Sequence, residues 1–403
     1  MALRSRLQIL FAVIAATSLS VPLMSQQREG RDVGNIHIPG SSIELAEDIG
    51  VRAHTHHLIL KNSATGLGPS GGMSPIQIQS FYGFTSKTGG QGVIAIVDAY
   101  DYPTALHDFN IFSAQFGLPQ ENSTNVTATG NRVFQIVYAG GTKPAGNGGW
   151  NEEAALDIEW AHAMAPNAKI VLVEAASASN SDLFAAVKAA AAIAGVEEVS
   201  MSWGESESSS ETGHDSTFNV NGPLFFAAAG DFSGVVEYPS CSPYVIAAGG
   251  TSVSTNSSGV WTAERAWSDG GGGNSRFEKK PPWQSGISTI TGTDRGVPDI
   301  SWDADPNSGV SVYDSTSYEG YVGWMVFGGT SVSSPSLAGA ANSSLPAGTF
   351  ANTTAFLTNF YSHFKTEPSL FRDITTGSAG RNKAGVGWDY CTGVGVPTGP
   401  ASF

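Results

Sequence analysis

Short apolar segments alternate with helical segments between residues 93 and 248, and this alternation constrains the fold more than any other feature of the chain. The expected strands are residues 93–97, 133–138, 170–174, 199–203, 224–229 and 245–248. The expected helices between them are residues 103–116, 152–165 and 182–194. Strands that are apolar on both sides are typical of parallel sheets covered by helices. The sequence therefore predicts an α/β domain with a mainly parallel central sheet.

Polar or aromatic side chains follow several of these strands. Asp98, Trp203 and Asp231 each stand where an expected strand ends. Active groups of such folds gather at the carboxyl ends of the strands, so we expect these side chains at the functional edge of the sheet.

The first 25 residues have the layout of a secretory signal. Arg4 and Arg6 precede an apolar stretch over residues 7–19, and small residues follow through Ser25. The stretch is too short to span a membrane. We therefore expect a secreted protein without membrane attachment after signal removal.

Residues 26–71 are polar and rich in Gly, Pro and Ser, which indicates a short leader and linker before a catalytic domain over residues 72–403. His54, His56 and His57 in this leader allow a metal site. However, no acidic or Cys partner clusters with them in the sequence, so we favour a surface strand.

The charge balance excludes one class of partner. The 403-residue chain carries a net charge of −15, with a pI near 4.8, which argues against nucleic acid. Near pH 5 the net charge approaches zero, so the chain avoids like-charge repulsion in acid. Cys241 and Cys391 allow either one disulfide or two buried thiols, and their spacing does not decide between these.

Glu153 and Asp157 lie four residues apart in an expected helix with Asn151 as its N-cap. They share one helix face, with Cβ atoms about 5–6 Å apart. Two neighbouring carboxylates do not both ionise easily, so such a pair can hold and pass a proton in acid. The alternative is a solvated face whose acids only complement the positive end of the helix.

Ser331 follows Gly328 and Gly329 at the start of an expected helix, with Pro335 suited to its first turn. Free backbone N–H groups at a helix start are natural partners for an oxyanion. Gly-Ser turns are common, so this segment alone does not separate a nucleophile from an ordinary turn.

Asp231 follows a small apolar strand. A carboxyl in such a place has a raised pKa and can donate a hydrogen bond to an oxyanion; the alternative is an ordinary turn residue. Among the eight histidines, only His162 is near the helix acids, and it lies on other faces of that helix. A carboxylate base therefore fits better than an imidazole.

A series of ordered motifs covers the chain from residue 72 to its end. They are EAALD at 153–157, SWG at 202–204, AGD at 229–231, GGT at 249–251, GGG at 271–273, PWQ at 282–284, RGVPD at 295–299, GTS at 329–331 and GWD at 387–389. With these motifs the chain resembles the sedolisin family, the serine-carboxyl peptidases. The resemblance implies a subtilisin-like fold and a monomer with endopeptidase or tripeptidyl-peptidase activity on protein or peptide substrates in acid.

The resemblance also implies residue roles. By motif position, Ser331 is the nucleophile, Glu153 the general base, Asp157 the carboxylate that supports it, and Asp231 the oxyanion donor. The substrate-binding positions implied are Trp203, with a core aromatic as the alternative, and Gly204. One structural calcium is implied near the C-terminus, at Asp373, Ile374, Gly385, Gly387 and Asp389.

The chain departs from the family pattern before residue 72, because the family's long folded propeptide is replaced by about 45 residues.

Two other functions are alternatives to the serine-carboxyl peptidase. One is an inactive exported peptide-binding protein on a peptidase scaffold. The other is a subtilisin-type Ser-His-Asp hydrolase.

Overall fold

The computed structural model describes residues 28–403 except residues 63, 65 and 85–87. The predicted secretory signal over residues 1–25 lies outside the described residues. In the described part, no helix combines the length and the apolar character that a membrane crossing requires.

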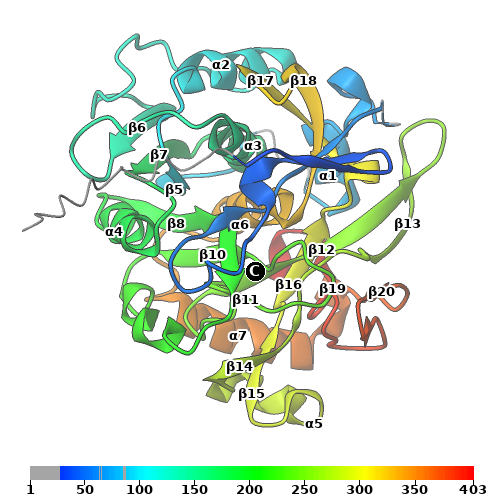
Figure 1. The fold of residues 1–403 in the computed structure, drawn as a ribbon. Coiled ribbons are helices and arrows are strands. Elements are labelled where there is room, and N and C mark those ends of the chain that lie inside the picture. The colour runs from blue at the N-terminus through cyan, green and yellow to red at the C-terminus, as the bar shows by residue number, and fades with distance from the viewer. Residues whose placement is uncertain (1–27, 63, 65, 85–87) are drawn as a thin grey trace, which may run out of the picture.

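The centre of the fold is an eight-stranded sheet with the order β13-β12-β10-β8-β5-β7-β6, in which β16 also pairs with the long strand β12 (Figure 1). All neighbours are parallel except β12 and β13. This confirms the predicted mainly parallel sheet. Its strands are β5 (Val93–Ala99), β6 (Phe134–Tyr138), β7 (Lys169–Ala175), β8 (Val196–Met201), β10 (Leu224–Ala228), β12 (Ile246–Thr255), β13 (Trp261–Ala266) and β16 (Ile300–Asp303).

Helices cover both faces of this sheet. Alternate side chains of β5 and β7 enter two separate cores, one formed with α3 (Gly148–Met164) and α6 (Thr330–Ser344), the other with α4 (Asn180–Ala191). Helices α3 and α6 pack against each other. The remaining helices are α1 (Pro75–Phe81), α2 (Ala105–Phe116), α5 (Ser288–Thr291) and α7 (Thr353–Thr366).

Several predicted element ends differ from the structure, and two of them lie beside the site. Helix α3 begins one turn earlier than expected, because Asn147 and not Asn151 is its N-cap, with its side chain accepting from Trp150 N at 3.3 Å. The predicted strand over residues 199–203 divides at Ser202 into β8 and β9 (Trp203–Ser206). The break turns the chain out of the central sheet at the edge where the site lies.

The leader is part of the folded structure. Its strands β1 (Arg31–Val33), β2 (Ile36–Ile38) and β4 (Leu58–Leu60) extend the antiparallel pair β17 (Val310–Tyr318) and β18 (Tyr321–Gly328). Its strand β3 (His54–Thr55) pairs with β9, which pairs with β11 (Glu237–Tyr238). In Figure 1 this blue segment crosses the front of the molecule over α6.

Three smaller strand pairs complete the fold. They are β14 (Gly273–Lys279) with β15 (Asp294–Val297), β19 (Phe371–Arg372) with β22 (Val396–Pro397), and β20 (Ser378–Ala379) with β21 (Asn382–Lys383).

Helix α3 is buried from Gly149 to Met164 on every side. Its ionisable side chains include Glu153 and Asp157, each 0% exposed. The alternative of a solvated acidic face is therefore wrong. Buried carboxyl groups need hydrogen bonds or opposite charges, and the contacts of these two define the site.

Candidate active site

Helix α3 supplies Glu153 and Asp157 one turn apart, as the sequence predicts. Asp157 Oδ1 accepts a hydrogen bond from Ser202 Oγ at 2.8 Å. Burial raises the pKa of Asp157 well above its usual range, and the nearby charges of Asp98 and Glu153 raise it further. Asp157 therefore holds a proton beside Glu153. Asp98, which lies in β5, is also buried, and burial together with the nearby charge of Glu153 raises its pKa well above the usual range.

Helix α6 presents Ser331 in its first turn, after Gly329 at φ 100°. Ser331 Oγ donates to the carbonyl oxygen of Ser202 at 3.3 Å. Pro335 lies inside the helix, beyond the predicted first turn. Having no N–H, it leaves the Ser331 carbonyl without its helical donor, and Ser202 Oγ lies 3.4 Å from that oxygen. Ser202 thus connects α3 to α6.

Asp231 follows β10 and turns back toward the start of α6. Its Oδ1 accepts from the backbone N–H and the hydroxyl of Thr330, each at 2.8 Å. Its Oδ2 is buried and has no hydrogen-bond partner among the described residues. Burial raises the pKa of Asp231 to about 7 despite the lowering effects of His56 and Thr330. Below that pH the free oxygen can carry a proton and donate it.

Leader residue His56 lies between these groups. Its N–H points to Glu153 Oε2 at 2.9 Å and to Ser202 O at 3.2 Å, and its carbonyl accepts from Ser331 N at 3.3 Å. A Cβ on Gly329 would collide with His56 O and would lie 2.5 Å from Asp231 Oδ2. Ser331 N–H and the free oxygen of Asp231 therefore both lie close to the His56 carbonyl. The structure thus brings Glu153, Asp231 and Ser331 together around the backbone of His56.

The leader runs through the site as an extended strand. His54 pairs with Gly204 and Thr55 with Trp203 in antiparallel register. The Trp203 ring packs in the core and its Nε1 donates to Val97 O at 2.7 Å, so Trp203 meets the leader through its backbone. Of the two interpretations of Trp203, the core aromatic describes its ring.

The predicted surface location of the leader histidines is wrong, because His54, His56 and His57 are at most 2% exposed. His57 Nδ1 lies 3.0 Å from Glu153 Oε2 and His57 Nε2 lies 3.1 Å from Glu152 Oε2. Burial alone would lower the pKa of His57, but the two carboxylates raise it to about 10. These partners come from distant parts of the chain, which sequence spacing could not reveal.

The contacts of His57 and Ser331 also show whether a histidine lies in position to act as the base. Both ring nitrogens of His57 face carboxylates, and within the described residues no imidazole is hydrogen-bonded to Ser331 Oγ. Ser331 Oγ also has no hydrogen bond to a described carboxylate; it donates to Ser202 O. His56 N–H links that oxygen to Glu153 Oε2.

The residues of the predicted calcium site meet at the loop over residues 385–389. Gly385 N donates to Asp389 Oδ2 and Gly387 N donates to Asp373 Oδ2, both at 2.8 Å. The carbonyl oxygens of Ile374, Gly385 and Gly387 accept no hydrogen bond from any described residue. Two carboxylates and three free carbonyls form an oxygen-only set, which fits calcium.

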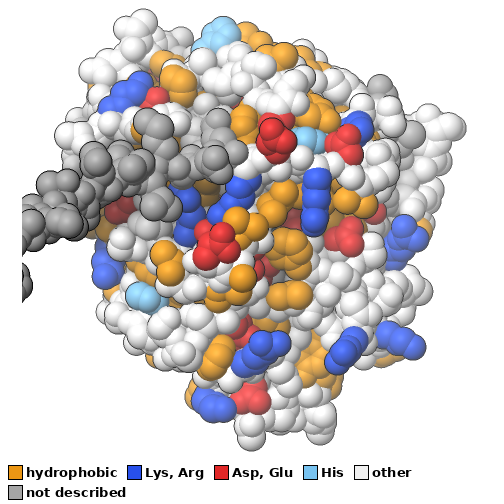
Figure 2. Space-filling view, viewed as in Figure 1, with side chains coloured by type: hydrophobic (Ala, Val, Ile, Leu, Met, Phe, Trp, Pro, Cys, Tyr) orange, Lys and Arg blue, Asp and Glu red, His pale blue; other side chains and the backbone are white. Residues whose placement is uncertain are grey.

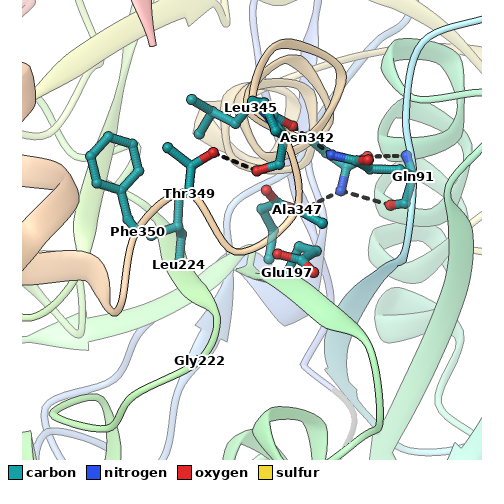
Figure 3. Close-up of a pocket in the computed structure, with 11 residues that line it drawn as sticks. Gln91, Glu197, Gly222, Leu224, Asn342, Leu345, Ala347, Thr349 and Phe350 are labelled. Carbon is teal, nitrogen blue, oxygen red and sulfur yellow. Dashed lines mark hydrogen bonds between the residues drawn. The ribbon is translucent and has the colours of Figure 1, made fainter.

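One hollow of the molecule lies at the site and another lies away from it. A cavity of about 450 Å³ opens beside the leader, with His56, Asp231 and Phe232 in its wall. A second hollow, shown in Figure 3, lies around Asn342 near the other end of the 15-residue helix α6. Asn342 stands eleven residues after Ser331, so the helical rise places it about 17 Å away, outside the site. Cys241 and Cys391 are both buried free thiols.

The chain is similar to known proteins over most of its length. A family model described as the subtilase family matches residues 120–347. Sedolisin from Pseudomonas sp. (strain 101) is 28% identical, over 85% of this chain and 63% of its own length. Kumamolisin from Bacillus sp. (strain MN-32) is 31% identical, over 91% of this chain and 71% of its own length. This chain therefore spans less than two thirds of that sedolisin.

A solved structure is similar in three dimensions. Pseudomonas sedolisin, a serine-carboxyl proteinase complexed with two molecules of pseudo-iodotyrostatin, matches with a TM-score of 0.67 and 27% identity. The match covers 81% of this chain and 95% of that one. The predicted subtilisin-like α/β fold is confirmed.

Proposed function

The chain belongs to the sedolisin family, and from this premise we propose that it is a serine-type endopeptidase that hydrolyses protein or peptide substrates in acid. One observation carries the proposal: the backbone of His56 is bound as the residue before a scissile bond would be. Its carbonyl meets Ser331 N, and its N–H meets Glu153 and Ser202 O. A substrate strand would lie in the same place.

The catalytic steps follow from these positions. Ser331 Oγ attacks the substrate carbonyl while Glu153 takes the hydroxyl proton. The C–N bond breaks as Glu153 passes this proton to the leaving amine, and the acyl group remains on Ser331. Water then gives a proton to Glu153 and attacks the acyl carbon. The C–O bond to Ser331 breaks as Glu153 returns this proton to Ser331 Oγ, which releases the acid and restores the enzyme. Asp157 supports Glu153 from the next helical turn.

The oxyanion of each tetrahedral intermediate is stabilised by two donors, Ser331 N–H and protonated Asp231. Glu153 must be ionised to take a proton, whereas Asp231 must be protonated to donate one. A pKa of about 7 at Asp231 keeps this donor protonated in acid. These two requirements support work in acid.

The number of residues before His56 helps to distinguish an endopeptidase from a tripeptidyl-peptidase. The leader continues upstream of His56 to residue 28 in the described part. The site thus accepts a strand with many residues before the scissile bond, which favours an endopeptidase over a tripeptidyl-peptidase.

Because the leader occupies the substrate position, we expect it to hold the enzyme inactive until it is cut. Incubation of the whole protein near pH 4 should release a new N-terminus at His57, detected by mass spectrometry of the products. Ser331→Ala protein should remain uncut under the same conditions. A first cut elsewhere, or cutting of the Ser331→Ala protein, would contradict the assigned register.

The other expectations complete the proposal. The chain is exported, with residues 1–25 as signal, 26–71 as leader and 72–403 as the catalytic part, and it works as a monomer without nucleic acid. Basic side chains on the face of Figure 2 are scattered among acidic and apolar ones, which supports the absence of a nucleic-acid partner.

An inactive peptide-binding protein is the alternative function. Covalent capture of Ser331 by a peptide aldehyde would exclude it.

Calcium at the loop over residues 385–389 would be held by Asp373, Asp389 and the carbonyls of Ile374, Gly385 and Gly387. It supplies no chemistry to the site. It would replace the mutual repulsion of the two carboxylates with attraction and fasten the loop to the segment around Asp373.

Removing calcium is expected to lower the melting temperature by several degrees, because the ion binds only the folded chain. Differential scanning calorimetry with and without a chelator measures this shift. Asp389→Asn should melt lower and lose its response to the chelator, whereas Asp294→Asn, a partly exposed aspartate paired with Lys279, should keep the response. An unchanged melting temperature on chelation would argue against the ion.

A further inference from the structure

Three buried side chains beside the site have no role in the steps above. His54 and His56 lie two positions apart in the extended leader, so their side chains point to the same side. Glu237 reaches them from β11, because the strand order β11-β9-β3 places it across β9 from the leader. We call His54, His56 and Glu237 the His–His–Glu trio.

The donor atoms of the trio are spaced for a metal ion. His56 Nε2 lies 2.6 Å and His54 Nε2 lies 3.6 Å from Glu237 Oε2. One ligand atom from each residue lies within 4.8 Å of both others. Tetrahedral zinc, with bonds of about 2.0–2.1 Å, sets its ligand atoms about 3.3 Å apart. The two separations from Glu237 Oε2 lie on both sides of this value and within about 0.7 Å of it.

The trio is buried but incompletely satisfied. His54, His56 and Glu237 are 2%, 1% and 0% exposed. Neither nitrogen of His54 has a hydrogen-bond partner among the described residues, nor does His56 Nδ1 or Glu237 Oε1. Buried polar atoms without partners are costly, and a cation between His54 Nε2 and Glu237 would remove part of this cost.

The surroundings suit an ion. Glu44 Oε1 lies 3.9 Å from His54 Nδ1, on the ring side away from Glu237, where a metal-bound imidazole usually meets a carboxylate. A Cβ on Gly204 would lie 2.8 Å from Glu237 Oε2 and 2.9 Å from His56 Cε1, so a glycine keeps this space free. The 450 Å³ cavity that His56 lines gives access to water.

We propose that His54, His56 and Glu237 bind one zinc ion, with water as the fourth ligand, and that this ion fastens the leader across the cleft. Two imidazoles and one carboxylate suit zinc, whereas calcium requires oxygen ligands. Two ligands come from the leader and one from the catalytic part. The leader therefore cannot leave while the ion is bound, and zinc slows its removal. The effect on leader removal rests on the proposed function; the metal site itself does not.

The test uses the whole chain with Ser331→Ala, in which the leader stays intact. After equilibration with zinc at pH 7 and desalting, elemental mass spectrometry should find one zinc per chain, and zinc should raise the melting temperature. Cobalt should give the visible absorption of a tetrahedral site. His54→Gln and Glu237→Gln should each weaken zinc binding at least about tenfold, whereas His107→Gln, an exposed histidine outside the trio, should not.

Circular dichroism of each variant shows whether the fold is retained, and the isosteric Glu237→Gln is the decisive variant if His54→Gln unfolds. No stoichiometric zinc, or zinc binding that Glu237→Gln leaves unchanged, overturns the site. In the active protein, saturating zinc should slow leader loss about tenfold, an effect that His54→Gln should abolish. If zinc binds but no peptide bond is cut, the proposed function fails and the site stands. If the leader is cut at the same rate with zinc bound, the fastening role fails alone.

Discussion

Ser331→Ala and Glu153→Gln are each expected to abolish hydrolysis of protein substrates, with kcat lowered about 10⁴- to 10⁶-fold. Alanine offers no oxygen to form the acyl intermediate. Glutamine keeps the shape of Glu153 but cannot take the serine proton. Initial rates of cleavage of a denatured protein near pH 4, measured on enzyme from which the active protein has removed the leader in trans, give the comparison.

Matched variants on the same helices separate chemistry from structure. Ser336 lies on α6 and is buried, with a hydroxyl that has no hydrogen-bond partner among the described residues, so Ser336→Ala should retain activity. Glu159 lies on α3 and accepts from Tyr313 N at 3.0 Å; burial raises its pKa, so Glu159→Gln should also remain active. Substantial activity of the Ser331→Ala enzyme would refute the assigned nucleophile, and an active Glu153→Gln enzyme would indicate another base.

Asp231 is expected to set the upper pH limit of activity. Burial and, more weakly, the charge of Glu237 raise its pKa, whereas His56 and Thr330 lower it, and the net result is a pKa of about 7. The protonated form donates to the oxyanion, so activity is present below this pKa and is lost as pH rises through it.

The pH profile of kcat/KM between pH 3 and 9 tests this role. Asp231→Ala should lose about 10²- to 10³-fold at every pH, because one oxyanion donor is gone. Asp231→Asn keeps an N–H donor that does not titrate, so it should retain more activity and lose the fall above neutrality. A fall at the same pH in Asp231→Asn enzyme, with the fold intact by circular dichroism, would assign the limit to another group.

Local pattern was enough to predict the scaffold. Strands such as β5 and β7 are apolar on both sides, and the β-α alternation leaves few arrangements other than a parallel sheet. Element ends were less certain. Asn147 and Asn151 are both good N-caps by composition, and the packing of α3 chose the earlier one.

The sequence identified candidate site residues but not the contacts between them. The order of the motifs identified Ser331, Glu153, Asp157 and Asp231 as candidates. Ser331 stands at a helix start and Asp231 follows a strand end, whereas Glu153 and Asp157 share one face of a helix. Ser202 was recognised only as part of a motif. Its contacts with Asp157 and with the Ser331 carbonyl depend on α3 and α6 packing together.

The leader shows where sequence reasoning ends. His56 and His57 follow a polar linker-like segment, and the sequence places no acid beside them. Glu153 is 97 residues after His56 and Glu237 is 181 residues after it. Contacts across such distances come from strand pairing and helix packing, which no local pattern encodes.

The sequence by itself determined the α/β class, the order of the elements and the four residues that a serine-carboxyl site would use, because these depend on periodicity and on motifs of a few residues. Only the tertiary structure decided that the leader lies in the cleft, that its histidines are buried against carboxylates, and that Ser331 N–H and Asp231 face one carbonyl. The physical reason is that these contacts join surfaces of separate elements. Their geometry exists only after β3 pairs with β9 and α6 packs on α3.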